Sequence, residues 1–183
     1  MRAAEWPLLL LLLLPHASAL LRNVPCAPAL RAPCLPLRRS SPQCGPRVRI
    51  VSVGKTKEAW LQLALAEYMK RVRTVSLECT WVRDDAALLA EARGACIVLD
   101  ERGKLCSSRE FSEMLFRALE EGGARLSFVI GAADGLPEAL RDGPHPLLSL
   151  SRMTLTHQMA RLVLAEQIYR ACEIRRGSKY HRG

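Results

Sequence analysis

The last residues of the chain bring together three side chains that could do chemistry. Tyr180, His181 and Arg182 are adjacent, so an aromatic ring, an imidazole and a guanidinium follow one another. Aromatic rings stack on unpaired RNA bases, an imidazole takes and gives protons near neutral pH, and a guanidinium pairs with phosphate. The group predicts either a catalytic tail in contact with RNA or a frayed chain end, which is the usual state of terminal residues.

Positive charge gathers at the same end of the chain. Residues 47–183 carry a net charge of +5, and residues 152–183, with seven basic and two acidic side chains, account for all of it. A basic surface confined to one end indicates a site for a polyanion such as RNA, whereas charges kept for solubility are the alternative interpretation. The candidate phosphate contacts are Arg152, Arg161, Arg175, Arg176, Lys179 and Arg182.

A second candidate site is the glycine-flanked segment Gly131-Ala132-Ala133-Asp134-Gly135, which follows an apolar run. A glycine that ends a buried strand permits a ligand to approach the backbone closely, although an ordinary turn has the same sequence. The segment is neither G-x-G-x-x-G nor a P-loop, so it matches neither of the two common nucleotide-binding motifs.

The composition of the 183 residues is that of an ordinary globular protein. Hydrophobic residues make up 49% and charged residues 25%, which excludes wholesale disorder and a collagen-like chain. The seven cysteines form no C-x-x-C pair and no Cys/His cluster at zinc spacing, so we expect neither a metal site nor a disulfide framework. Cys96 lies in an apolar run and is expected to be a small buried side chain.

Strands and helices alternate from residue 47 onwards. β-rich or apolar runs predict strands at residues 48–53, 75–82, 95–99 and 126–130. Apolar residues at helical spacing predict helices at about residues 57–71, 85–91, 108–121 and 157–175. Thr56 is expected to cap the first helix, and Ser107 with Glu110 forms a capping box before the third.

The apolar runs at 95–99 and 126–130 do not alternate with polar residues. This pattern indicates strands covered on both faces, as in a parallel sheet flanked by helices. We therefore predict an α/β domain of four or five strands over residues 47–183, with a two-layer α+β fold as the alternative. Such sheets bind ligands beyond the carboxyl ends of their strands, which here are 54–55, 99–100 and 131–135.

Residues 1–46 differ from the rest and predict a targeting segment. They hold eight of the eleven prolines, five arginines, one acidic residue and the leucine run Leu8–Leu14, which is shorter than the roughly 20 residues that span a bilayer. Met1–Ala19 alone resembles a secretory signal peptide, whereas the Arg-rich, acid-free stretch Leu20–Pro46 is typical of mitochondrial transit segments. We expect a mitochondrial protein, with the secretory pathway and a secreted binding protein as the alternative.

An ordered series of short motifs runs through residues 47–183. Its members are Val51-Ser52-Val53-Gly54-Lys55, Glu67-Tyr68, Arg71, Phe128-Val129-Ile130-Gly131, Gly135, Leu150-Ser151, Met153-Thr154-Leu155, His157-Gln158-Met159, the run from Leu164 to Ala171, and Tyr180-His181-Arg182. The series resembles that of the ribosomal RNA large subunit methyltransferase H family, which belongs to the SPOUT class of methyltransferases.

The resemblance implies a SPOUT-type parallel sheet flanked by helices, with a C-terminal trefoil knot, in a homodimer. It implies transfer of a methyl group from S-adenosylmethionine to N3 of a pseudouridine in large-subunit ribosomal RNA on the ribosome, with no metal and no membrane. By match with the family, the cofactor-binding residues are Leu99, Gly131, Leu150, Ser151, Arg152, Met153, Thr154 and Leu155. Tyr180 and His181 are the catalytic candidates, Arg161, Arg175, Arg176, Lys179 and Arg182 the RNA-binding ones, and His157 is expected to help cap the last helix.

Three features depart from the family's pattern. Ala132 occupies a loop position where many relatives have glycine, Thr156 one where proline is common, and the connection from Cys79 to Asp100 is shorter. The Cβ of Ala132 bears on the geometry of the expected cofactor site, because glycine leaves that space free. A non-catalytic RNA-binding or ribosome-assembly protein that keeps the SPOUT fold is therefore the alternative function.

Overall fold

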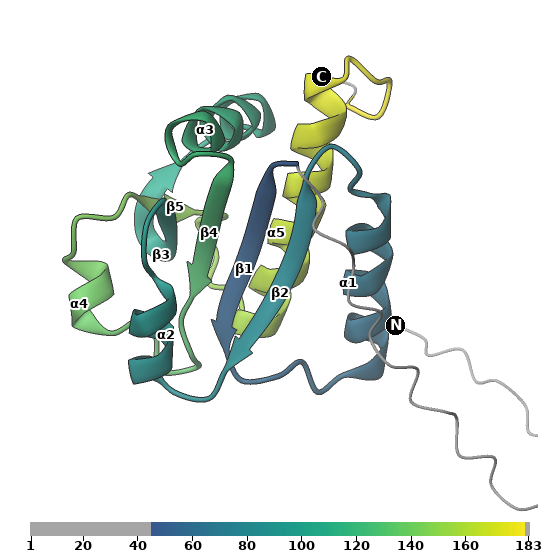
Figure 1. Cartoon of the computed structure of the whole chain (residues 1–183). Helices are drawn as coiled ribbons and strands as arrows, with labels where there is room; N and C mark the ends of the chain where they lie inside the picture. Colours follow the sequence, from purple (N-terminus) through teal and green to yellow (C-terminus); the bar gives the residue numbers. More distant parts are fainter. Residues whose placement is uncertain (1–44, 182–183) are drawn as a thin grey trace, which may run out of the picture. The chain divides into compact units, whose positions relative to one another are not determined.

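The computed structural model describes residues 45–181, which form one parallel sheet covered by helices on both faces (Figure 1). The strands are β1 (Arg47–Val53), β2 (Ser76–Val82), β3 (Cys96–Leu105), β4 (Arg125–Ile130) and β5 (Leu147–Ser149). All neighbours pair in parallel, in the order β2-β1-β4-β3-β5. The predicted α/β class with a parallel sheet is confirmed. Residues 1–44 of the predicted targeting segment lie outside the described residues.

The five described helices divide between the two faces of the sheet. They are α1 (Ala59–Arg71), α2 (Asp85–Glu91), α3 (Ser108–Glu121), α4 (Glu138–Arg141) and α5 (His157–Arg175). Helices α1, α3 and α5 share one apolar cluster with the sheet, and Figure 1 shows α5 running behind β1 and β2. Helices α2 and α4 share the other cluster. Two covered faces explain why β4 is buried from Leu126 to Ile130: Phe128 belongs to the first cluster and Val129 to the second.

Side-chain caps begin two helices, and the one at α3 is the capping box that the sequence predicts. The Asp84 carboxylate accepts a hydrogen bond from the backbone N–H of Ala87, which begins α2. Ser107 and Glu110 form the reciprocal capping box that begins α3. Burial raises the pKa of the Cys96 thiol to about 11, so this cysteine is the inert, buried side chain that the apolar run predicts.

The start of α1 differs from the prediction. Thr56 does not cap this helix; its side chain is buried, and the hydroxyl accepts a hydrogen bond from Arg161 of α5. The helix begins at Ala59, after Glu58, whose side chain makes no capping bond. A long-range partner has therefore replaced the local one, and the chain between β1 and α1 forms a loop, residues 54–58, that is called here the β1–α1 loop.

The carboxyl ends of β1, β3, β4 and β5 meet at one edge of the sheet, where α5 also begins. The connections that leave this edge after β4 and β5 are residues 131–137 and 150–156. β3 extends past this edge to Leu105, beyond the predicted end at residue 99, because Lys104 and Leu105 also pair with β5. The sequence-predicted ligand-binding edge is thus built from loops that leave neighbouring strands.

Candidate active site

A cleft of about 380 Å³ lies at the carboxyl ends of β3, β4 and β5. It is lined by Leu99, Asp100 and Glu101 of β3, by residues 130–136, by residues 148–155 except Arg152, and by Arg141, His157 and Ala160. A volume of this size lies within the usual range of small-molecule sites, roughly 300–1,000 Å³. The cleft therefore occupies the position, and has the size, of a ligand site in a parallel α/β sheet.

The loop after β4 is a tight turn that closes on itself. The backbone N–H of Ala132 donates to the carbonyl of Gly135, and the N–H of Gly135 donates to the carbonyl of Ala132, each at 3.1 Å. A Cβ on Gly131 would lie 2.3 Å from the Gly135 carbonyl oxygen. Glycine is thus required at position 131 by the turn itself, whereas the sequence suggested that a ligand approaches this backbone.

The loop after β5 is shaped by serine side chains. The Ser149 hydroxyl donates to the carbonyl of Ser151, and the Ser151 hydroxyl accepts from the N–H of Met153, at 2.9 and 3.0 Å. Leu150 and Leu155 are half-buried against the core, whereas Met153 is 75% exposed. The loop thereby offers apolar side chains and backbone polar groups to the cleft together.

Seven of the eight predicted cofactor residues lie in this cleft: Leu99, Gly131, Leu150, Ser151, Met153, Thr154 and Leu155. Arg152 is the exception, because its exposed side chain does not line the cleft. Asp100 lies at a predicted ligand-binding strand end but had no predicted role, and Arg141 was not predicted as a site residue. Arg141 has no comparable signal in the sequence, because it reaches the cleft through a short helix that no periodicity marks.

Charged groups of both signs line the cleft. The Asp100 carboxylate is 8% exposed, accepts from the backbone N–H of Arg102 and lies 3.5 Å from Nε of Arg141. That Nε is buried and makes no hydrogen bond. Arg141 can therefore donate to an acceptor on a bound ligand. Glu101, also on the cleft, is exposed and has no ion-pair partner among residues 45–181.

His157 lies where the cleft meets the start of α5. The helix cap is the Thr156 hydroxyl, which accepts from the backbone N–H of Met159, so the expectation that His157 caps the helix is wrong. Thr156, a departure from the family's pattern, thus has a structural role of its own. Burial, together with the positive charges of Arg161 and Lys57, lowers the pKa of His157, which favours a neutral imidazole at this position.

Arg161 is buried, and its prediction as an RNA contact is wrong. Its guanidinium donates to the carbonyls of Val53 and Gly54 at 2.6 and 2.7 Å, and to the Thr56 hydroxyl at 3.1 Å. It also lies over the ring of Trp81. The side chain is 1% exposed, and burial lowers its pKa to about 10. These contacts bind the β1–α1 loop to α5, which leaves the guanidinium no access to phosphate.

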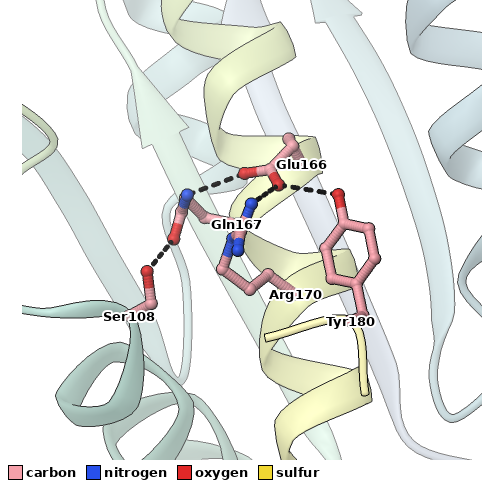
Figure 2. A network of polar contacts seen from close by, with 5 residues as sticks. All are labelled: Ser108, Glu166, Gln167, Arg170 and Tyr180. Atoms are coloured by element: carbon pink, nitrogen blue, oxygen red, sulfur yellow. Dashed lines mark hydrogen bonds and ion pairs between the residues drawn. The ribbon is translucent and has the colours of Figure 1, made fainter. Parts of the chain in front are cut away.

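The tail, residues 177–181, folds back along α5 (Figure 2). The Tyr180 hydroxyl donates to Oε1 of Glu166 at 3.1 Å, and Arg170 donates to the same oxygen at 2.7 Å. The Tyr180 ring packs edge-on against Tyr169, with the Arg170 guanidinium over its face. Desolvation and the negative charge of Glu166 raise the pKa of the Tyr180 hydroxyl. The tail is therefore held by specific contacts, and Tyr180 is not part of a frayed end.

The same network continues to α3. Nε2 of Gln167 donates to the second oxygen of Glu166, and the Ser108 hydroxyl donates to Oε1 of Gln167, at 2.7 and 3.0 Å (Figure 2). Glu166 thus accepts from three side chains, one of them in the tail. We call Glu166, Arg170 and Tyr180 the tail latch.

The tail and the cleft do not meet within one chain. Neither Tyr180 nor His181 lines the cleft. The cleft contacts α5 at Ala160, whereas Tyr180 contacts it at Glu166, about 9 Å further along a helix that rises 1.5 Å per residue. His181 is half-buried, and its Nδ1 is buried with no hydrogen-bond partner in the described part of the chain. The structure therefore separates the predicted catalytic residues from the predicted cofactor residues.

Arg152 is exposed in the loop after β5, and three other predicted RNA contacts lie at the end of α5, near the tail. Arg175 pairs with Glu120 at 3.6 Å and Arg176 with Glu173 at 2.8 Å, but both arginines are exposed. Lys179 is exposed and has no ion-pair partner among residues 45–181. Arg182 lies outside the described residues. The end of α5 thus presents an exposed basic surface, to which the buried Arg161 does not contribute.

Comparison with known proteins decides the family. The model of a family described as "Predicted SPOUT methyltransferase" matches residues 47–181. The chain belongs to the SPOUT methyltransferase family. Its relatives include "Ribosomal RNA large subunit methyltransferase H" of Protochlamydia amoebophila, 46% identical over 140 residues that cover 74% of this chain and 99% of the relative. The protein of the same name from Thermus thermophilus is 43% identical over 138 residues, 74% of this chain and 98% of that one.

Solved structures agree on the fold. A probable methylase family protein from Haemophilus influenzae Rd KW20 aligns with a TM-score of 0.50 and 16% identity, covering 74% of this chain and 70% of that one. SPOUT methyltransferases use S-adenosylmethionine. The cleft of this SPOUT chain fits that molecule in three respects: its volume, the apolar side chains that line it, and the guanidinium of Arg141, whose Nε makes no hydrogen bond.

Within residues 45–181, no group of three or more His, Cys, Asp or Glu side chains could hold a metal ion. None of the helices in this part of the chain combines the length and apolar character that crossing a membrane requires.

Proposed function

We propose that this protein transfers a methyl group from S-adenosylmethionine to N3 of a pseudouridine in large-subunit ribosomal RNA. The observation that carries the proposal is that seven residues matched to the family's cofactor site line a single cleft in a chain of the SPOUT family. The names of the relatives support a ribosomal RNA substrate. The choice of nucleotide follows the resemblance of the tail motif Tyr180-His181-Arg182.

The residues of the cleft have distinct tasks in this proposal. Leu99, Leu150 and Leu155 supply apolar surface for the adenine ring, and the backbone of the loops after β4 and β5 reads its polar edge. Arg141 would hold the carboxylate of the amino-acid part, because its Nε, although paired with Asp100, makes no hydrogen bond. Bound S-adenosylmethionine supplies a sulfonium that makes its methyl group electrophilic. The carboxylates of Asp100 and Glu101 suit the positive charges of this molecule.

The tail would act on the base. N3 of the base must lose a proton, and a positioned general base speeds proton transfer by about 10²–10⁴-fold. We assign this role to His181 and the stacking of the base to Tyr180, which the tail latch holds in place. Orientation of the base towards the methyl group lowers the barrier further, by several kcal/mol.

We also propose a homodimer, because tail and cleft are apart within one chain and a second copy can bring a tail to each cleft. Trp60 and Leu63 of α1 are 57% and 73% exposed, and α1 packs beside α5, where Leu162 and Val163 are half-buried. An apolar surface of this kind suits a second subunit. Light scattering at micromolar concentration should give twice the mass of the chain, and Leu63→Glu should halve it. A monomeric wild-type protein would contradict this assembly.

Two further features complete the proposal. We propose that the loops after β4 and β5, which lie together at the cleft, are threaded as the trefoil knot that the family resemblance implies. We propose a mitochondrial location, because the Arg-rich, acid-free stretch at residues 20–46 agrees with an organellar ribosome as substrate. Imaging of the intact chain with a C-terminal tag tests the location, and a secretory pattern would contradict it.

The decisive experiment compares methylated uridines in organellar ribosomal RNA with and without this protein. We expect one methylated position to disappear in its absence. Calorimetry with S-adenosylmethionine and a turnover assay on ribosomes accompany the mapping. Cofactor binding or RNA binding without any turnover would instead identify a non-catalytic ribosome-assembly protein.

A further inference from the structure

The buried guanidinium of Arg161 marks a loop whose position is fixed. Arg161 donates three hydrogen bonds at the end of β1 and in the β1–α1 loop. Two further bonds hold this loop: the N–H of Lys57 donates to Oε1 of Gln158 at 3.3 Å, and Nε2 of Gln62 donates to the carbonyl of Thr56 at 2.6 Å. Surface loops that only connect two elements rarely receive a fully buried cation, because its desolvation costs free energy. The anchoring indicates that the loop's position matters.

The anchored loop presents two lysines beside the cleft. Lys55 and Lys57 are exposed, and neither side chain has an ion-pair partner among residues 45–181. Gln158, which accepts from Lys57, directly follows the cleft-lining His157. The charge of Lys57 also contributes to the lowered pKa of His157, so it acts within electrostatic reach of the cleft. Lys55 lies at a predicted ligand-binding strand end, whereas Lys57 belongs to no predicted site.

We propose that Lys55 and Lys57 bind RNA phosphates at the rim of the cleft, and that Arg161 positions them for this task through the β1–α1 loop. The inference rests on the proposed function and adds an RNA contact at the cleft, far from the basic end of α5. Lysines bind phosphate as point charges, without the bidentate geometry that arginine provides. One acidic side chain, Glu58, opposes them in the same loop.

Salt dependence of RNA binding tests the two lysines. The probe is deproteinised bacterial large-subunit ribosomal RNA, with S-adenosylmethionine affinity measured in parallel. Because each lost phosphate contact to single-stranded RNA reduces the slope of log K against log salt by about 0.7, Lys55→Gln/Lys57→Gln should reduce it by about 1.4. Glu58→Gln should change RNA affinity in the opposite direction and strengthen it. S-adenosylmethionine affinity should not change in either variant.

The matched control is Lys70→Gln/Arg73→Gln. It removes two exposed charges that have no ion-pair partner among residues 45–181, in the last turn of α1 and just after it, at the opposite edge of the sheet. An equal loss of slope in both double variants would show a general effect of net charge and overturn the proposal. Wild-type protein that binds S-adenosylmethionine but not RNA would overturn the proposed function and this inference together. Wild-type binding with no difference between the variants would overturn the inference alone.

Two variants test Arg161 as the positioning residue. Arg161→Lys keeps the charge but cannot reach both carbonyls and the Thr56 hydroxyl, and Thr56→Val removes one acceptor only. Both should speed tryptic cleavage after Lys55 and Lys57 and reduce the RNA slope, with the larger effect in Arg161→Lys. A loosened loop with an unchanged RNA slope would show that Arg161 has only a structural role.

Discussion

The cleft and the tail of this SPOUT methyltransferase are held in shape by different means. The cleft depends on backbone: a turn closed by two hydrogen bonds between Ala132 and Gly135, and a glycine at 131 that no other residue can replace without overlap. The tail depends on side chains, through the hydrogen bond between Tyr180 and Glu166. Cofactor binding at the cleft and activation of the base by the tail should therefore be lost through different substitutions.

The two regions also differ in charge. The cleft contains the carboxylates of Asp100, Glu101 and Asp134 and one arginine, Arg141, whereas the end of α5 presents exposed Arg175 and Lys179. Carboxylates suit a cationic cofactor and basic side chains suit an RNA backbone. Substitutions in one region should therefore leave the ligand of the other bound.

Deletion of residues 180–183 should have the largest effect on activity. The truncated protein is expected to bind S-adenosylmethionine normally, because neither Tyr180 nor His181 lines the cleft, and to lose nearly all methylation of ribosomes. His181→Ala should reproduce about 10²-fold or more of that loss, and higher pH should partly restore it as the base ionises unaided. Single-turnover methylation across pH measures both effects. Full activity of the truncated protein would exclude the tail from catalysis.

Gly131→Val should disrupt the cleft. The added side chain overlaps the Gly135 carbonyl, so the turn must open, with a loss of stability of about 1–3 kcal/mol and of S-adenosylmethionine binding. Calorimetry and urea unfolding measure the two losses. Ala132→Gly, which restores the residue common in relatives, is the control and should bind the cofactor at least as well as wild type. A folded Gly131→Val protein with unchanged affinity would place the cofactor elsewhere.

Substitutions of Arg161 and Arg175 compare how much the two ends of α5 contribute to stability. Arg161→Met should lower the free energy of unfolding by about 1–3 kcal/mol, because it leaves the carbonyls of Val53 and Gly54 without their donor. Arg175→Met, at an exposed ion pair, should change it by less than about 0.5 kcal/mol. Urea denaturation measures both. Equal effects at the two ends would contradict the description of Arg161 as a structural anchor.

Tyr180→Phe should loosen the tail without disturbing the cleft. The variant keeps the ring contact with Tyr169 and loses the hydrogen bond to Glu166, a loss of about 1 kcal/mol from local stability. Faster tryptic cleavage after Lys179, with unchanged S-adenosylmethionine affinity, is the expected result. Tyr68→Phe, whose ring also contacts Tyr169, is the control. The same cleavage rate in wild type and Tyr180→Phe would show that the latch does not hold the tail.

His157 should produce the smallest effect, in the pH dependence of stability. Its folded pKa lies below the unfolded value near 6.5, so the unfolded chain binds more protons between these two values. Its contribution is therefore complete above pH 6.5 and is lost as the pH falls through the folded pKa. In His157→Gln the free energy of unfolding should decrease less as the pH falls from 7 to 5. An unchanged slope would show that His157 does not titrate below its normal range.

Much of the fold was predictable because its signals are local. The helix over residues 85–91, the capping box of Ser107 with Glu110, and the apolar run at 126–130 each depend on residues within a few positions of one another. β5 and α4 were not predicted, because three and four residues are too few to show a period. The family motifs placed seven of eight residues at the cleft, since the ends of parallel strands share one edge.

The α/β class, the capping box of α3, the ligand-binding edge and the family follow from the sequence alone. The folded structure was needed to show that Arg161 bonds to Thr56, 105 residues away, and that the turn itself requires glycine at position 131. It also showed that Tyr180 packs against α5, away from the cleft. A basic residue in a sequence indicates a charge but not its exposure. Burial and pairing arise only when distant segments pack, and they convert a predicted phosphate contact into an anchor.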